Sequence, residues 1–380
     1  MSDKINVMII DDSALMRNLI KTSLSNHEQI NVVGTAINGK FGFKKLNILK
    51  PDLIILDLEM PDMNGIDFLK ERKRLGIKIP VIILSAHAQK GAKITFEALA
   101  LGASDFILKP SGYDNDINKT KDRLIEMIIA LGRPNTYKVD DGYIEIKPKV
   151  EIINEIQKFK IEVEEKSPEV QKIIPANYLQ KIKKIPEIDI IVMGISTGGP
   201  SALRNILPVF PSNFPIPIVI VQHMPAGFTY EFAKNLNNAC PLEVKEAEED
   251  DVIRPGRILI APGDKHIIFN KKKLGVVIKL DENPPVNGHR PSVDVLFKST
   301  SEIYGENSLA CIMTGMGKDG ASNIGLILEK GGITIAQNKE TSVVFGMPRI
   351  AIESRNIQII LPLAEIPETI IKIVKKKYKF

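Results

Sequence analysis

Short apolar runs alternate with amphipathic stretches over the first 130 residues of the chain. Stretches between the runs have helical periodicity: in Ala14–Leu24, for example, Leu15, Leu19 and Ile20 share one face, and a last helix is expected over Ile117–Leu131. Buried strands separated by helices predict five βα units that form a parallel sheet covered on both faces. The expected strands are Asn6–Ile10, Asn31–Ala36, Leu53–Leu58, Pro80–Ser85 and Asp105–Leu108.

The same alternation resumes at Glu187 and predicts a second α/β domain. A β-hairpin is expected over His266–Leu280, with its turn at Asn270–Lys273. The expected strands are Asp189–Ile195, Ile216–Gln222, Arg257–Ala261, Ser308–Thr314 and Ile333–Ala336. The expected helices are Ser201–Phe210, Phe228–Asn238, Val293–Tyr304, Ala321–Glu329 and Met347–Ser354.

The segment between these two regions has a different composition. From Arg133 to Ile185 it holds one glycine, Gly142, and many Lys, Glu and Ile residues, and Pro168 and Pro175 interrupt any helix. The predicted organisation is therefore a first domain over residues 4–125, a charged linker over 126–185 and a second domain over 186–376.

Composition and charge exclude several classes of protein. The 44% apolar and 26% charged residues among 380 are an ordinary globular balance and argue against disorder of the whole chain. The net charge of +5 is a mild excess for this length, and it argues against a nucleic-acid partner, because such proteins concentrate their basic residues. The clearest basic run is the tail Lys375, Lys376, Lys377 and Lys379, for which a solvated tail is expected.

Cysteine usage and apolar runs complete this picture. Cys240 and Cys311 have neither metal-ligand spacing nor a disulfide framework. No apolar run reaches the roughly 18 to 20 residues of a membrane span, so membrane insertion is not expected. The start of the chain becomes acidic before a signal-like stretch can form, so we expect a cytoplasmic protein.

Charged and hydroxyl side chains follow several strands of the first domain. Asp11 and Asp12 follow the first strand, Asp57 ends the third, and Ser85 and Lys109 end the fourth and fifth. The carboxyl ends of parallel strands meet at one edge, where repulsion between three carboxylates is offset by a hard cation such as Mg²⁺. A hydroxyl and an ammonium group there can bind phosphoryl oxygens, so a carboxylate could accept a phosphoryl group. For Asp12 alone, a helix cap is the favoured alternative.

These residues stand in the motifs IIDDSALMR, LDLEMPDMNG, ILSA and FILKP, which resemble the receiver domain of response regulators over about residues 4–125. The resemblance implies a flavodoxin-like (βα)5 fold, Asp57 as phosphoacceptor, a histidine kinase as phosphodonor, and Mg²⁺ held by Asp11 and Asp12 together with Asp57. It also implies that Ser85 and Lys109 sense the phosphoryl group. Phe106 stands at the family's aromatic switch position, with an ordinary core phenylalanine as the alternative.

The first candidate for catalysis is Ser196, in the glycine-rich junction Gly194-Ile195-Ser196-Thr197-Gly198-Gly199. This junction matches G-x-S-x-G between a strand and a helix, the setting of an exposed nucleophile. A dinucleotide-binding turn is the rival, but the acidic residue expected about 20 positions later is replaced by Gln222 and His223. His223 follows the next strand and could act as a base toward Ser196.

A third candidate lies in CIMTGMGKDGA, where a loop with three glycines encloses Asp319. Its carboxylate could hold one tautomer of a histidine or cap the next helix. The chain order Ser, His, Asp does not exclude a triad, because triads are recognised by geometry.

The stretches MGISTGGPSAL, VIVQHMPAGFT, LIAPGDKHI, HRPSVDVLF, MTGMGKDGA and FGMPRIAI resemble the CheB family of chemotaxis protein-glutamate methylesterases. The resemblance implies a Rossmann-like α/β catalytic domain with Ser196 as nucleophile, His223 as base and Asp319 as its partner. It also implies oxyanion stabilisation by the loop amides of Thr197 and Met316.

The implied activity is hydrolysis of glutamate γ-methyl esters on methyl-accepting chemoreceptors, with deamidation of receptor glutamines and no cofactor for hydrolysis. Phosphorylation of Asp57 is expected to relieve blocking of the Ser196 cleft. A hypothesis from another class stays open at this point: a phosphorylation-dependent binding protein in which the Ser/His/Asp set is incidental.

Overall fold

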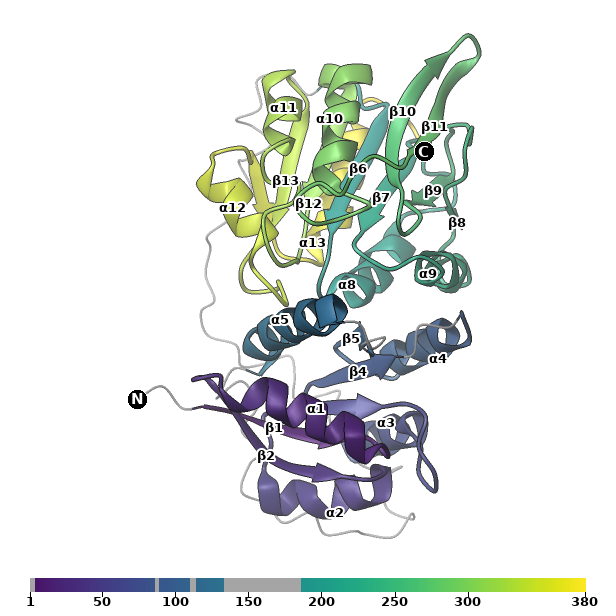
Figure 1. Cartoon of the computed structure of the whole chain (residues 1–380). Coiled ribbons are helices and arrows are strands. Elements are labelled where there is room, and N and C mark those ends of the chain that lie inside the picture. Colours follow the sequence, from purple (N-terminus) through teal and green to yellow (C-terminus); the bar gives the residue numbers. More distant parts are fainter. Residues whose placement is uncertain (1–3, 86–88, 110–113, 133–185) are drawn as a thin grey trace, which may run out of the picture. The chain divides into compact units, whose positions relative to one another are not determined.

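The computed structural model describes residues 4–85, 89–109, 114–132 and 186–380. Both expected sheets are present, and the fold class of two doubly wound α/β domains is confirmed (Figure 1). The predicted linker lies almost entirely outside the described residues, and the predicted domain boundaries stay predictions. The boundary at residue 125 falls within a helix that runs to Leu131.

The first domain holds a five-stranded parallel sheet of order β2-β1-β3-β4-β5. Helices α1 and α5 pack on the core formed by alternate residues of the strands, with Ile20 and Leu24 of α1 against Val7 and Ile9. The strands are β1 (Ile5–Ile10), β2 (Ile30–Ala36), β3 (Leu53–Asp57), β4 (Val81–Ser85) and β5 (Asp105–Leu108). The helices are α1 (Ala14–Ser25), α2 (Gly39–Leu49), α3 (Gly65–Arg74), α4 (Gln89–Ala100) and α5 (Asp114–Leu131).

The second domain holds a seven-stranded parallel sheet of order β14-β13-β12-β6-β7-β9-β8. Burial of every residue of β6, β7, β12 and β13 explains why these strands read as continuous apolar runs. The strands are β6 (Ile190–Ile195), β7 (Ile218–Gln222), β8 (Glu243–Glu246), β9 (Arg257–Ile260), β12 (Ser308–Ile312), β13 (Ile333–Gln337) and β14 (Ile359–Leu361).

Helices and a two-stranded antiparallel hairpin accompany this sheet. Helices α10, α11 and α12 contribute Val293, Ile324 and Met347 to one core cluster with the sheet. The hairpin pairs β10 (His266–Lys272) with β11 (Gly275–Asp281). The helices are α8 (Gly199–Ile206), α9 (Phe228–Asn237), α10 (Val293–Ile303), α11 (Ile324–Glu329), α12 (Met347–Glu353) and α13 (Glu365–Lys375), with one-turn 3₁₀ helices at Leu207–Val209 and Gly305–Asn307.

The structure corrects the sequence prediction in a few places. The hairpin turns at Lys273 and Leu274, because Asn270 still pairs with Val277 in the ladder. Strands β8 and β14 and helix α13 were not expected. Strand β8 is polar, EVKE, and sits at the edge of the sheet, where one face is solvated and the apolar signal is weak. The lysines of the tail are exposed, as expected.

Candidate functional site

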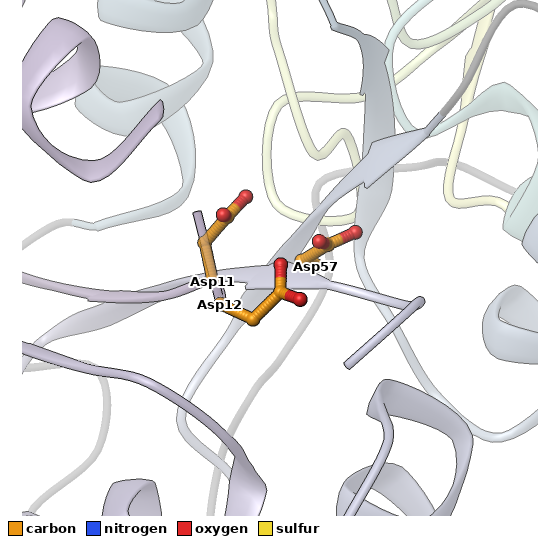
Figure 2. Close-up of side chains that lie close together, drawn as sticks. All are labelled: Asp11, Asp12 and Asp57. Carbon is orange, nitrogen blue, oxygen red and sulfur yellow. The ribbon is translucent and has the colours of Figure 1, made fainter. Parts of the chain in front are cut away.

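Three carboxylates gather at the carboxyl edge of the first sheet. Asp11 follows β1 and Asp57 ends β3, and these strands are neighbours. One carboxylate oxygen from each of Asp11, Asp12 and Asp57 lies within 4.8 Å of the others (Figure 2). The alternative of a helix cap at Asp12 does not hold, because Ser13 caps α1 by accepting a hydrogen bond from the Met16 amide, and the Asp12 side chain is exposed.

Lys109 neutralises part of this negative charge. Its Nζ lies 2.7 Å from Asp57 Oδ2 and 3.4 Å from Asp11 Oδ2. Burial raises the pKa of the Asp57 carboxyl, and the Lys109 ammonium offsets this only in part. Within the described part of the chain, Asp11 Oδ2 is buried without a hydrogen bond. A hard cation takes such oxygen ligands, so the residues fit Mg²⁺.

The other two residues expected to sense a phosphoryl group are buried. Ser85 Oγ, at the end of β4, lies 2.6 Å from Thr95 Oγ1 of α4. Phe106 lies in β5, and its ring stacks on Phe228 of the second domain with a centroid distance of 5.0 Å. Phe106 therefore joins β5 to α9, and its role as a switch residue stays a prediction.

Ser196, His223 and Asp319 form a hydrogen-bonded line in the second domain. Ser196 follows β6 and His223 follows the adjacent parallel strand β7, so both side chains lie at one edge of the sheet. Ser196 Oγ is 3.2 Å from His223 Nδ1, and His223 Nε2 is 2.8 Å from Asp319 Oδ2. All three residues are buried. A neutral imidazole that donates its Nε2 proton to the carboxylate keeps the Nδ1 lone pair free to accept from the serine hydroxyl.

This use of the imidazole reverses the arrangement of chymotrypsin, in which Nε2 faces the serine and Nδ1 faces the aspartate. The chemistry needs only that opposite ring nitrogens serve the two partners. The arrangement can therefore move a proton from Ser196 to His223 while Asp319 stabilises the resulting imidazolium.

Asp319 is fixed by several donors besides His223. Its carboxylate accepts hydrogen bonds from Ser292 Oγ and Asn287 Nδ2 and from the first amides of α10, those of Val293 and Asp294. Burial opposes ionisation, but the hydrogen bonds from His223, Ser292 and Asn287 outweigh it and hold the pKa of Asp319 below its usual value. Asp319 therefore accepts hydrogen bonds from the start of α10 as well as from His223. The alternative weighed from the sequence was a cap on the helix that follows Asp319 in the chain.

The loop around Ser196 is tightly packed. Gly198 has a φ of 78° and precedes α8, and a Cβ on Gly315 would lie 2.8 Å from Ser196 Cβ, so Gly315 lets the Met316 loop approach the serine. Among the described residues, the Thr197 and Met316 amides donate no hydrogen bond to another protein group. Both amides flank Ser196 along loops that meet there, which suits stabilisation of an oxyanion.

His289 was not expected to take part, and it lies against His223. The two rings stack with centroids 3.8 Å apart and an interplanar angle of 7°. Burial, helped by the neighbouring His223, lowers the pKa of His289 to about 4, so the ring is uncharged at neutral pH. Only the hairpin and the loop after it bring His289 to this place, and no local sequence signal marks it.

A carboxylate of the first domain also reaches the serine loop. Asp105, the first residue of β5, accepts a hydrogen bond from the Gly198 amide over 2.9 Å. Asp105 and Gly198 are separated by 93 positions, and the bond is buried. Sequence reasoning gave Asp105 only a place in a strand.

Comparison with known proteins agrees with both halves of this description. The family model described as CheB methylesterase matches residues 191–370, and the response regulator receiver domain matches residues 7–120. The protein-glutamate methylesterase/protein-glutamine glutaminase of Treponema denticola is 47% identical over 92% of this chain and 93% of its own length. The protein of the same description from Treponema pallidum is 42% identical over 93% of each chain.

Among solved structures, the CheB methylesterase catalytic domain of Thermotoga maritima is 43% identical, with a TM-score of 0.48. The matched region covers 50% of this chain and 100% of the Thermotoga domain. The identity to the Treponema proteins over almost the whole chain decides the assignment. The chain belongs to the protein-glutamate methylesterase/protein-glutamine glutaminase family, with a receiver domain followed by a CheB-type methylesterase domain.

Proposed function

We propose that the chain hydrolyses γ-methyl esters of glutamate on methyl-accepting chemoreceptors and deamidates receptor glutamines. The observation that carries this proposal is the buried line from Ser196 through His223 to Asp319. The names of the relatives supply the substrate class, and the hydrogen-bonded line supplies the chemistry of acyl transfer. Esters and primary amides share this chemistry and differ in the leaving group, methanol or ammonia.

The reaction begins with attack of Ser196 Oγ on the ester carbonyl. His223 Nδ1 takes the serine proton as the new Oγ–C bond forms, and the Thr197 and Met316 amides stabilise the oxyanion. The C–O bond to methanol then breaks, and His223 gives the proton to the departing methoxide oxygen. A water molecule releases the free glutamate by the same steps, with His223 again as base.

Asp319 acts on His223 throughout this cycle. Its carboxylate accepts from Nε2–H and so keeps the Nδ1 lone pair directed at Ser196. It also stabilises the imidazolium that forms after proton transfer. Because donors from α10 already hold this carboxylate, its position does not depend on the substrate.

We also propose that phosphorylation of Asp57 raises the hydrolase activity. Asp57 accepts the phosphoryl group from a histidine kinase, and Asp11, Asp12 and Asp57 would hold Mg²⁺, which offsets negative charge during phosphoryl transfer. Ser85 and Lys109 would contact the phosphoryl group. A movement of Phe106 would then pass to Phe228 of the second domain, on which its ring stacks. Phosphorylation shifts an equilibrium only if the two arrangements bind the phosphoryl group unequally.

The contact between Asp105 and Gly198 supports inhibition in the unphosphorylated state. It places a receiver-domain carboxylate on an amide two residues from Ser196. The inhibitory arrangement keeps this bond, and release of the receiver domain from the Ser196 loop breaks it. Asp105 lies one position before Phe106, so a change at the aromatic residue moves the same strand.

Replacement of Asp105 with alanine tests this contact. Asp105→Ala removes the bond to Gly198, and we expect activity without phosphodonor to rise about 5- to 150-fold, the usual range for coupling between sites. The measurement is the initial rate of hydrolysis of a small soluble methyl ester, with and without a small phosphodonor and Mg²⁺.

Asp52→Ala is the matched control, because Asp52 accepts a backbone hydrogen bond from Asn6 within the receiver domain. It should leave the rate without phosphodonor unchanged, whereas Asp57→Ala should remove the response to phosphodonor. A receiver domain that only tethers the enzyme predicts no phosphodonor effect and no gain in Asp105→Ala, and that outcome would reject the inhibitory contact.

In the described part of the chain, no helix is long and apolar enough to cross a membrane. A cytoplasmic location stays a prediction.

The alternative, a phosphorylation-dependent binding protein with an incidental Ser/His/Asp set, predicts that a p-nitrophenyl ester is not hydrolysed through Ser196.

A further inference from the structure

Gln222 connects the two residues that exchange the proton. It is the last residue of β7 and is 2% exposed. Its Nε2 donates to the Ser196 carbonyl over 3.0 Å and to the His223 carbonyl over 3.2 Å. A primary amide has two N–H donors on that nitrogen, and both are used here. One side chain therefore spans the backbone of Ser196 and His223.

This bridge lies where the regular ladder between β6 and β7 ends. The last backbone bond of the ladder runs from the His223 amide to the Ile195 carbonyl. Beyond this bond both strands end and continue as loops, β6 into the loop before α8 and β7 into the loop before α9. The Gln222 side chain continues the cross-strand connection by one position, at the residues that carry the reacting groups.

The oxygen of the Gln222 amide explains why residue 199 is a glycine. Gln222 Oε1 is buried and, among the described residues, accepts no hydrogen bond. A Cβ on Gly199 would lie 1.9 Å from this oxygen and 2.9 Å from Gln222 Cδ. Gly199 is not among the residues with positive φ, so the backbone does not require glycine there. The absence of a side chain at position 199 makes room for the Gln222 amide.

We propose that Gln222 is a positioning residue that sets the separation of Ser196 Oγ and His223 Nδ1, with Gly199 as its steric counterpart. The inference rests on the proposed hydrolase function, and it adds a residue outside the Ser/His/Asp line. Gln222 does not touch the reacting atoms; it acts through the backbone of the two residues that carry them.

No other side chain of similar shape supplies the same bonds. Methionine has the length of glutamine but no donor, and an ionised glutamate offers only acceptors to two carbonyl oxygens. Either replacement frees the Ser196 and His223 backbones to move apart. A misplacement of about 1 Å costs on the order of 10²-fold in rate, so we expect kcat to fall by about that factor with KM within twofold.

The test compares Gln222→Met and Gln222→Glu with the unaltered chain and with Gln358→Met. Gln358 is a matched control because its Oε1 accepts from the Thr334 amide near β14, away from Ser196. Three quantities are measured on full-length protein: kcat and KM on a small methyl ester, the rate of covalent labelling of Ser196 by a fluorophosphonate, and Tm. The labelling rate reports the reactivity of Ser196 without any natural substrate.

The expected result is a loss of about 10²-fold in both kcat and labelling rate for the two Gln222 variants, with Gln358→Met unchanged in both. Should Gln222→Met fail to fold, the isosteric Gln222→Glu decides. Wild-type kcat and labelling rates in a folded Gln222 variant, or a change confined to KM and Tm, would overturn the positioning role. Absence of labelling in the unaltered chain would instead overturn Ser196 as nucleophile, so the two failures are distinct.

Discussion

Replacement of Ser196 with alanine is expected to lower kcat for ester hydrolysis by about 10⁶-fold, the size of the loss when the serine of subtilisin is removed. The alanine keeps the backbone of the loop and removes only the oxygen that attacks the carbonyl. Among the described residues, the one side-chain hydrogen bond of Ser196 Oγ is with His223 Nδ1, so the fold should survive the change. The measurement is methanol release from a small methyl ester, together with Tm.

Two further variants control this result. His223→Ala should lose about as much activity as Ser196→Ala, and the double variant should lose little more, because the two residues act as a unit. Ser201→Ala is the matched control, since Ser201 is exposed on α8, and its kcat should equal that of the unaltered chain. Near-wild-type turnover in Ser196→Ala would be incompatible with the proposed mechanism.

The second large effect is expected for Asp319→Asn, with a loss in kcat of about 10⁴-fold by comparison with the equivalent change in chymotrypsin. The physical reason is the hydrogen bond from His223 Nε2 to Asp319 Oδ2. An asparagine amide can donate to the imidazole and so favour the wrong tautomer, and it stabilises an imidazolium poorly. We expect the change in kcat, because Asp319 contacts the ring nitrogen of His223 opposite the one that faces Ser196.

Stability should fall as well, because Asp319 accepts from Ser292, Asn287 and the first amides of α10. Replacing one oxygen by an NH₂ group leaves buried donors unpaired, which costs about 1–3 kcal/mol. A residue that only capped α10 would show the loss in the free energy of unfolding with kcat maintained. Parallel measurement of Tm and kcat on Asp319→Asn separates these two roles.

The pH dependence of stability follows from the lowered pKa of Asp319. A carboxyl whose pKa is depressed in the folded state stabilises it above the unfolded pKa, and this contribution is lost as the pH falls through the folded value. In thermal unfolding followed from pH 7 downward, the unaltered chain should lose this contribution only below about pH 4, the ordinary aspartate range. Asp319→Asn should show a weaker acid dependence; equal profiles would contradict the assignment.

Much of the fold follows from the sequence because buried parallel strands read as apolar runs. Strands β3 and β6 are examples, with every residue buried. The polar edge strand β8 gave no such signal. Helix α13 has the expected helical spacing, with Ile366, Ile370 and Ile373 buried, but the lysine-rich end of the chain has the composition of a solvated tail.

The site was predictable where its residues stand at strand ends. Ser196, His223 and Asp57 fall into this group, since strand order places such positions at one edge. The roles of other residues depend on partners far away in the chain. Asp105 meets Gly198 across 93 positions, and His289 meets His223 through a loop without a local signature. Only the folded chain brings these pairs together.

The most direct test of the central claim is methanol release from chemoreceptors that carry isotopically labelled glutamate methyl esters. The full-length chain with phosphodonor and Mg²⁺ should release labelled methanol and leave one glutamate carboxylate for each methanol, faster than without phosphodonor. Ser196→Ala should release none above background under either condition. Release at the wild-type rate by Ser196→Ala, or no release by the phosphorylated full-length chain, would contradict the account.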